Sequence, residues 1–179
     1  MLFRSVAIAR ALVTDPEVIL ADEPVSMLDV STQAAILKLL SSLIEDFDVS
    51  MLYISHDLST VSYICDEINV MYLGRIVESA STEDLLNEPK HPYSKELIGA
   101  VPIPNPHHER TRTQLEGSTP DPKNLGTGCR FKDRCPDRMD ICNQTPISYG
   151  IEADRKVACH LYYDHEEYNE TADSTGDAS

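Results

Sequence analysis

Two short apolar runs that flank a helical pattern constrain the fold of this chain more than any other feature. Residues 17–22 (EVILAD) and 50–55 (SMLYIS) lack the polar alternation of a half-exposed strand, which is typical of parallel strands buried on both faces. Between them, apolar residues at three- and four-residue steps predict a helix over about 31–47, capped by Asp29 or Ser31. This order of elements predicts an α/β fold with a parallel sheet and a right-handed crossover.

Weaker local signals predict the remaining elements. The second strand is followed by a helix over about 58–65, and two β-rich runs around Gly74 predict a hairpin. A short capped helix begins at Ser81, and a brief helical piece covers 94–101. The residues that follow predict a linker over 102–128, rich in Pro, Gly, Asn and Thr, a cysteine-rich segment over 129–159, and a disordered acidic tail.

The charge balance excludes several classes of partner. The 179 residues include 30 Asp and Glu against 15 Lys and Arg, for a formal net charge of −15, which argues against nucleic acid and against a polybasic membrane anchor. We expect neither a signal peptide nor a membrane span here, since the first apolar stretch is short and charged and no apolar run reaches the roughly 18 residues that span a bilayer. The acidic excess fits either a partner that requires negative charge or an acidic surface suited to a high-salt cytoplasm; we favour the second, a halophilic source.

Two adjacent carboxylates at the end of the first apolar run are the strongest candidate site. In open α/β sheets, ligands bind beyond the carboxyl ends of the strands, where Asp22 and Glu23 are expected. Asp22 is placed to hold Mg²⁺, which favours one or two carboxylates together with phosphate oxygens. Glu23 would then polarise the water that attacks the terminal phosphate. Taken alone, the pair is more often a strand that ends in two solvated acidic residues.

The surroundings of this pair resemble the ATPase subunit of ABC transporters. Upstream, VAIARAL (6–12) is similar to the helix that follows the LSGGQ signature of that family. Directly downstream, SMLD (26–29) resembles the D-loop, and ISHD (54–57) closes the next strand.

This resemblance implies a role for each matching residue. Asp22 would bind Mg²⁺-ATP, and Glu23 would be the catalytic glutamate. Ser26 and Asp29 would lie in the D-loop at the interface with a second ATPase subunit. His56 would be the catalytic switch histidine that contacts the γ-phosphate.

Further along, the chain is similar to the C-terminal region of oligopeptide and dipeptide importer ATPases. The similar stretches are NVMYLGRIVE (69–78), NEPKHPYSKELIGAVP (87–102) and the turn GSTP (117–120). The resemblance implies a peripheral protein at the cytoplasmic face of the cell membrane. It would act with a second ABC ATPase subunit, two transmembrane permease subunits and an extracytoplasmic peptide-binding protein. The expected parts are the C-terminal part of an ABC ATPase domain with a partial P-loop NTPase sheet (1–80), a peptide-importer linker extension (81–128), a small irregular four-cysteine module (129–162) and a disordered tail (163–179).

Four of the five cysteines form a separate candidate centre: Cys129, Cys135, Cys142 and Cys159. In a cytosolic protein, clustered cysteines bind metal more often than they form disulfides. The gaps are wider than the usual zinc pairs and differ from common ferredoxin spacings, so spacing leaves zinc, iron–sulfur and reduced thiols open.

The importer resemblance implies a [4Fe–4S] cluster on these four cysteines, with Zn²⁺ as the alternative. Nearby cationic side chains would offset the negative charge of such a cluster: Arg130, Lys132, Arg134 and Arg138. His160 is an alternative ligand, and Cys65 is expected to be a core residue.

Three motifs of an ABC ATPase are missing from this sequence. It contains no P-loop of the form G-x-x-x-x-G-K-[ST], no Q-loop glutamine and no LSGGQ signature. The simplest account is a C-terminal portion left by truncation, frameshift or a misassigned start. We therefore expect the 179-residue chain alone neither to hydrolyse ATP nor to be well soluble. Alternatives from other classes are a non-enzymatic metal-binding regulatory module and a non-functional remnant.

Overall fold

The computed structural model describes residues 2–100, 126–152 and 154–162. It is a mixed α/β structure that divides into two compact units, residues 1–66 and 67–179. The hairpin around Gly74, expected in the first domain, belongs to the second unit. Most of the predicted linker and the whole predicted tail lie outside the described residues. Among the residues described, no helix combines the length and apolar character needed to cross a membrane.

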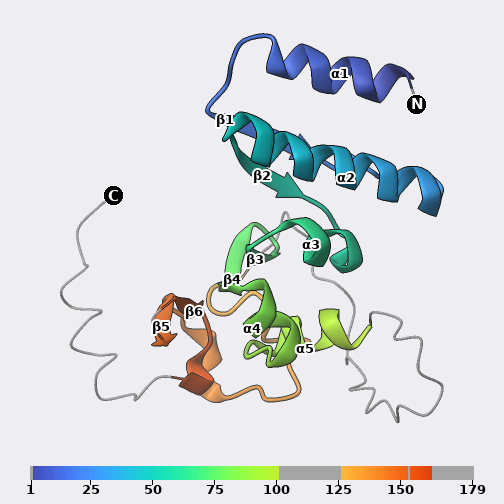
Figure 1. The fold of residues 1–179 in the computed structure, drawn as a ribbon. Coiled ribbons are helices and arrows are strands. Elements are labelled where there is room, and N and C mark those ends of the chain that lie inside the picture. The colour runs from blue at the N-terminus through green and yellow to red at the C-terminus, as the bar shows by residue number, and fades with distance from the viewer. Residues whose placement is uncertain (1, 101–125, 153, 163–179) are drawn as a thin grey trace. The chain divides into compact units, whose positions relative to one another are not determined.

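Unit 1 contains the predicted strand–helix–strand arrangement (Figure 1). Its elements are α1 (Leu2–Leu12), β1 (Val18–Asp22), α2 (Val30–Phe47), β2 (Ser50–Ile54) and α3 (Leu58–Ile64). The two strands pair in parallel, in register from Val18 opposite Ser50 to Asp22 opposite Ile54. Parallel neighbours need a crossover, and α2 supplies it. The prediction of a parallel pair is confirmed, whereas the wider P-loop sheet stays a prediction.

One face of this strand pair packs on α2. The core there consists of Val25, Ile36, Leu37 and Leu40, with Met51 and Tyr53 of β2 packed against it. Side chains alternate across a strand, so the other face carries Val18, Leu20, Leu52 and Ile54, which are 45–64% exposed. The prediction that both strands are buried on both faces is therefore wrong for the structure as described: only the face toward α2 is covered.

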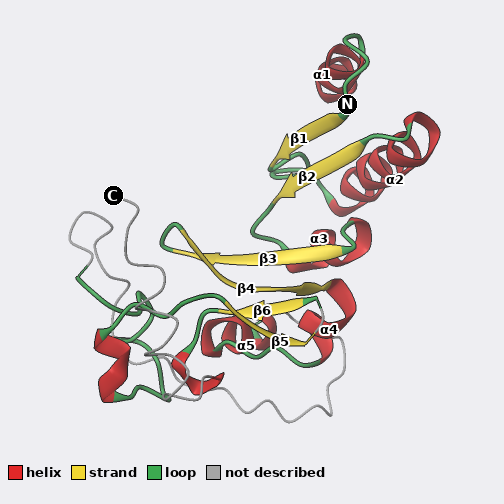
Figure 2. Cartoon of the chain, turned by 90° about the vertical axis from the view of Figure 1, so that its left-hand side faces the viewer, coloured by secondary structure: helices red, strands yellow, loops and turns green. Residues whose placement is uncertain are grey.

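Unit 2 is built on an antiparallel sheet of order β3-β4-β6-β5 (Figure 2). Its elements are β3 (Glu67–Tyr72), β4 (Arg75–Ser81), α4 (Thr82–Asn87), α5 (Pro92–Gly99), η1 (Asp140–Asn143), β5 (Tyr149–Glu152), β6 (Arg155–Val157) and η2 (His160–Tyr162). The predicted hairpin is confirmed, and both turn residues, Leu73 and Gly74, have positive φ of 46° and 78°. Ser81 caps α4 as predicted, by accepting from the amide of Asp84 at 3.1 Å.

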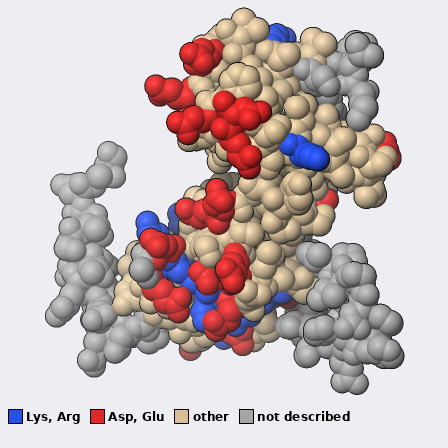
Figure 3. Space-filling model, viewed as in Figure 1, with Lys and Arg blue, Asp and Glu red and all other residues tan. Residues whose placement is uncertain are grey.

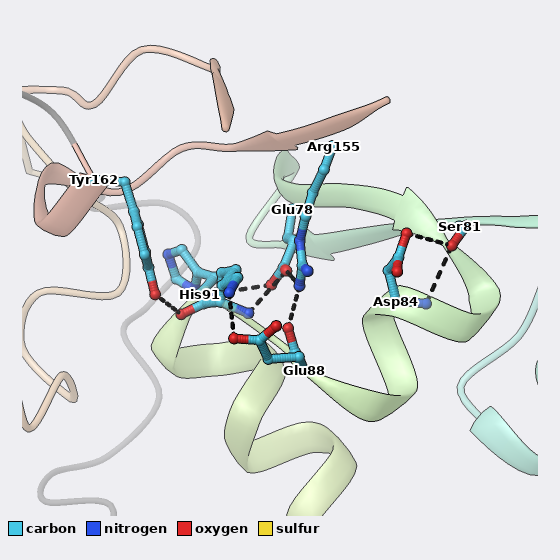
Figure 4. A network of polar contacts seen from close by, with 8 residues as sticks. Glu78, Ser81, Asp84, Glu88, His91, Arg155 and Tyr162 are labelled. Carbon is cyan, nitrogen blue, oxygen red and sulfur yellow. Dashed lines mark hydrogen bonds and ion pairs between the residues drawn. The ribbon is translucent and has the colours of Figure 1, made fainter. Parts of the chain in front are cut away.

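A buried ion pair joins three segments of unit 2 (Figure 4). Glu78 of β4 is 1% exposed and accepts from Arg155 of β6 at 2.9 Å. The same carboxylate accepts from the backbone amides of Lys90 at 2.9 Å and His91 at 2.8 Å. The Tyr162 hydroxyl donates to the Lys90 carbonyl at 2.8 Å. The turn before α5 is thus held through both its amides and its carbonyls.

An aromatic cluster attaches the cysteine-rich segment to this framework. Phe131 is 1% exposed, and its ring centroid lies 5.3 Å from that of Tyr72 and 5.5 Å from that of Tyr93. His91 is 5.8 Å away and caps α5 by accepting from the amide of Tyr93 at 3.0 Å. Such ring pairs add stability beyond the area they bury.

Acidic side chains outnumber basic ones in the printed sequence, 30 to 15. On the face drawn in Figure 3, Asp and Glu occur on both units, and Lys and Arg are interspersed mainly on unit 2. The distribution agrees with a generally acidic surface, while the halophilic source stays a prediction.

Candidate functional site

The ends of β1 and β2 bring the two predicted catalytic residues together. The amide of Glu23 donates to the carbonyl of Ile54 at 2.9 Å, so the pairing continues one residue beyond β1. Because the strands are parallel, the residues that follow them emerge at the same edge of the pair. His56 therefore lies beside Glu23, although 33 positions separate them in the sequence.

Glu23 and His56 are in direct contact. Glu23 Oε1 lies 2.7 Å from His56 Nδ1 and accepts from the backbone amide of His56 at 3.2 Å. The hydrogen bond that the Glu23 carboxylate accepts from the imidazole, together with the negative charge of Glu23, raises the pKa of His56 above the ordinary value. The His56 side chain is 81% exposed and that of Glu23 is 35% exposed, so solvent weakens the attraction between them. The arrangement places a carboxylate and a titratable imidazole at one strand edge, where each can hold or receive a proton.

Asp22 occupies the last position of β1 and is exposed. A solvent-facing carboxylate at this edge suits Mg²⁺, which retains several waters and takes few protein ligands. Asp22 therefore has the donor type and the exposure that suit the ion predicted from the sequence.

The two predicted D-loop residues have different partners. Ser26 donates through its hydroxyl to the Glu23 carbonyl at 2.9 Å. Asp29 is the N-cap of α2 and accepts from the amide of Thr32 at 3.0 Å. Hydrogen bonds from the Ser31 side chain and from Thr32 lower the pKa of Asp29 to about 2. The Asp29 carboxylate is therefore ionised and engaged by its own helix.

Sequence reasoning overlooked Asp57 as a structural residue of the site. It caps α3 by accepting from the amide of Ser59 at 3.0 Å, which fixes the chain directly after His56. An Asp placed just before a helical segment is a recognisable N-cap signal.

The four predicted cysteine ligands belong to unit 2 as free thiols. The amide of Cys129 donates to the carbonyl of Cys142 at 2.9 Å, so these two backbones are adjacent. Burial, with the neighbouring thiols, raises the pKa of Cys135 to about 11 and that of Cys159 to about 12. Metal ligation requires thiolates, so a metal would have to displace these protons.

The arrangement does not support a preformed metal centre. In the part of the chain that the structure describes, no three His, Cys, Asp or Glu side chains are grouped so that they could hold a metal ion. His160 instead contacts the carbonyl of Gln144 through Nε2 at 3.1 Å. The donor types suit iron–sulfur or zinc, but their placement fits neither, so the predicted [4Fe–4S] cluster is unsupported.

The basic side chains predicted to offset a cluster have other acceptors. Lys132 donates to the Thr127 carbonyl at 2.8 Å, and Arg138 pairs with Asp133 at 3.1 Å. Arg130 donates to the carbonyl of Leu73 in the β3–β4 turn. These bonds attach the cysteine-rich loop to itself and to the hairpin. Cys65 is half-buried, and burial raises the pKa of its thiol, as suits the predicted packing role.

Comparison with known proteins agrees with the importer resemblance. The chain is 48% identical over 160 residues to the putative oligopeptide transport ATP-binding protein YkfD of Bacillus subtilis, covering 88% of this chain and 49% of the relative. It is 45% identical over 154 residues to the dipeptide transport ATP-binding protein DppF of Escherichia coli, covering 86% and 46%. A putative peptide import ATP-binding protein of Brucella ovis is 50% identical over 140 residues, covering 78% and 44%.

The chain thus spans about half the length of the curated relatives it matches. Residues 77–142 also match the family model described as the oligopeptide/dipeptide transporter, C-terminal region. Residues 77–142 are therefore similar to that C-terminal region. The homologues of the chain are ATP-binding proteins of peptide transport.

Proposed function

We propose that this chain forms part of the ATP-binding subunit of an ABC-type peptide importer, which couples ATP hydrolysis to substrate uptake. The observation that carries the proposal is the Glu23–His56 contact at the edge of a parallel strand pair. It occurs in a chain that is 45–50% identical to ATP-binding proteins of peptide transport. The proposal includes a P-loop NTPase fold for the complete domain, at the cytoplasmic face of the membrane.

The residues at the strand edge divide the work of hydrolysis. Asp22 would hold Mg²⁺, an ion that would supply positive charge against the phosphates when bound. Glu23 orients and deprotonates the attacking water, and His56 holds the Glu23 carboxylate and contacts the γ-phosphate. Ser26 and the segment up to Asp29 face a second ATPase subunit. Two permease subunits and an extracytoplasmic peptide-binding protein complete the importer.

Nucleotide binding needs a P-loop that this sequence does not contain. A P-loop supplies the backbone amides and the lysine that hold the β- and γ-phosphates. We expect catalysis only when these 179 residues are joined to, or associated with, polypeptide that carries those groups.

A chimeric subunit tests this proposal. In it, the 179-residue chain replaces the part of the Escherichia coli dipeptide transport protein that it matches. We expect ATP hydrolysis by the purified chimera and dipeptide uptake in cells that lack the native subunit. Replacing Glu23 by Gln should reduce hydrolysis by about 10²–10⁴-fold.

Lys38→Gln serves as the matched control, because it removes one charge from an exposed position in the middle of α2. A folded chimera that hydrolyses ATP equally well with Gln at position 23 would contradict the role of Glu23. A folded chimera without any ATPase activity would contradict the assignment itself.

A metal-binding regulatory module is the second candidate function. Burial and the neighbouring thiols raise the pKa of Cys135 and of Cys159, and a cavity of about 380 Å³ borders Cys129. We propose that iron–sulfur or zinc binding would require these side chains to rearrange and lose protons. Anaerobic reconstitution with iron and sulfide, or with zinc, tests this against a Cys142→Ser variant. Stoichiometric metal in the wild-type chain alone supports it, and equal uptake by both chains contradicts it.

A further inference from the structure

The turn after β1 contains two residues in an unfavourable backbone conformation. Glu23 has a φ of 47° and Met27 has a φ of 61°. Both values lie in the left-handed region, which residues other than glycine rarely adopt. Glu23 also precedes Pro24, and residues before proline ordinarily take extended conformations. Such conformations persist only where the surrounding bonds determine them, and they concentrate at functional sites.

Three hydrogen bonds hold Glu23 in this conformation. On its amino side, the Glu23 amide donates to the Ile54 carbonyl at 2.9 Å. On its carboxyl side, the Glu23 carbonyl accepts from the Ser26 hydroxyl at 2.9 Å and from the Ser26 amide at 3.2 Å. Because each peptide unit is planar, these bonds orient both planes that flank the Glu23 Cα. The direction in which the side chain leaves the backbone is thereby set.

That direction leads to His56. The Glu23 carboxylate reaches both the ring nitrogen and the backbone amide of His56, at 2.7 Å and 3.2 Å. The His56 ring is 81% exposed, so surrounding atoms do little to restrain it. The geometry of the pair is therefore determined mainly from the backbone of Glu23.

We propose that Ser26 is a positioning residue, whose hydroxyl holds the left-handed turn that directs the Glu23 carboxylate toward His56. The inference deepens the proposed function and rests on it, since the direction of Glu23 matters for hydrolysis only if Glu23 serves the attacking water. The bond itself belongs to the 179-residue chain and can be measured without nucleotide.

The protonation site of neutral His56 provides the measurement. An imidazole that donates from Nδ1 to a carboxylate is held in the tautomer with its proton on Nδ1. In the ¹⁵N-labelled 179-residue chain, at a pH where His56 is neutral, we expect this tautomer to predominate. The Glu23→Ala variant gives the fraction of Nδ1-protonated His56 in the absence of the carboxylate.

Two substitutions of Ser26 separate the hydroxyl from general effects of mutation. Glu23→Ala should lower the Nδ1-protonated fraction of His56, and Ser26→Ala should cause more than half of that decrease. Ser26→Thr, which keeps a hydroxyl, should retain the wild-type fraction. Ser42→Ala is the matched control, because the Ser42 hydroxyl donates to the Leu39 carbonyl at the same 2.9 Å but within α2.

The outcomes distinguish the two proposals. A His56 tautomer unchanged by Ser26→Ala, but altered by Glu23→Ala, would overturn the positioning role. So would an equal loss in Ser26→Ala and Ser26→Thr, or a tautomer that does not respond to Glu23→Ala. Failure of the chimeric subunit to hydrolyse ATP would refute the proposed function and leave the Ser26 result intact.

Discussion

The two units of this chain differ in how completely they bury their apolar and charged side chains. Unit 1 carries the candidate site on a strand pair with one apolar face exposed and with strained residues at its edge. Unit 2 buries an ion pair and a cluster of aromatic rings, and its best-covered side chains, such as Leu85 and Val157, are 0% exposed. The unit proposed to act on nucleotide thus leaves one apolar face of its strand pair exposed, whereas the unit with the four clustered cysteines has a buried ion pair and a buried ring cluster. The comparison predicts that substitutions in the buried network of unit 2 mainly lower its unfolding free energy. Substitutions on the exposed strand face of unit 1 should mainly change self-association.

Breaking the buried pair should have the largest effect. Arg155→Met leaves the Glu78 carboxylate buried without its cationic partner, and we expect unit 2 to lose about 3–5 kcal/mol of unfolding free energy. Hydrogen exchange of the Lys90 and His91 amides, which donate to Glu78, should accelerate accordingly. Denaturant titration and exchange measured by NMR provide the readout.

Arg138→Met is the control for that experiment. Its pair with Asp133 spans 3.1 Å, with side chains 49% and 58% exposed, so we expect a loss within about 1 kcal/mol. Equal losses in the two variants would show that the Glu78 network does not distinguish unit 2.

The exposed face of unit 1 should govern association. Leu52 is 58% exposed in a row of apolar side chains, and contiguous patches of this kind promote self-association. Leu52→Lys should shift the chain toward monomer in sedimentation velocity with little change in unfolding free energy. Val30→Lys adds the same charge at an 82% exposed position of α2 and should leave association unchanged. A wild-type chain that is already monomeric at high concentration would contradict this expectation.

The sequence predicted those features that depend on local pattern. The apolar period of α2 and the two flanking runs were sufficient to predict a parallel pair, whereas the contact between Glu23 and His56 was not predicted. Burial of the strands was predicted incorrectly, because a continuous apolar run does not reveal what covers each face. The α5 helix begins at Pro92, two residues before the predicted start, because His91 caps it and proline is favoured in the first turn.

Features that depend on contacts distant in sequence, or on an uncommon backbone conformation, were not predicted. Strands β5 and β6 are four and three residues long and lack a periodic signal. The Glu78–Arg155 pair joins positions 77 apart, so no local pattern indicates it. The bond from Ser26 to the Glu23 carbonyl depends on a backbone conformation that residue type does not favour. The state of the four cysteines was not predicted from their spacing either, because that spacing left zinc, iron–sulfur and reduced thiols open.

Two histidines extend the comparison to pH. Burial lowers the pKa of His91 in unit 2 to about 4. The unfolded chain takes up a proton near the ordinary value of about 6.5, and the folded one does so only near 4. The unfolded state therefore binds more protons in that range, and unit 2 should lose stability as the pH falls through it. His91→Asn, which can still cap α5, should reduce this loss in denaturant titrations at pH 7 and pH 4.5. An identical pH dependence in the variant would contradict burial as the cause.

His56 in unit 1 should behave in the opposite sense and with the smallest effect. Its pKa is raised by Glu23, so the folded state binds the proton more tightly than the unfolded state. The stabilisation is complete below the ordinary pKa of about 6.5 and is lost as the pH rises through the raised value. His56→Ala should therefore destabilise unit 1 slightly at pH 6 and less at pH 9. Because the pair is exposed, 0.5 M salt should diminish the difference, and Ser26→Ala should diminish it as well. A difference between wild type and His56→Ala that is insensitive to both pH and salt would mean that His56 contributes by packing and not through its charge. Of the two histidines, only the buried His91 of unit 2 would then make stability depend on pH.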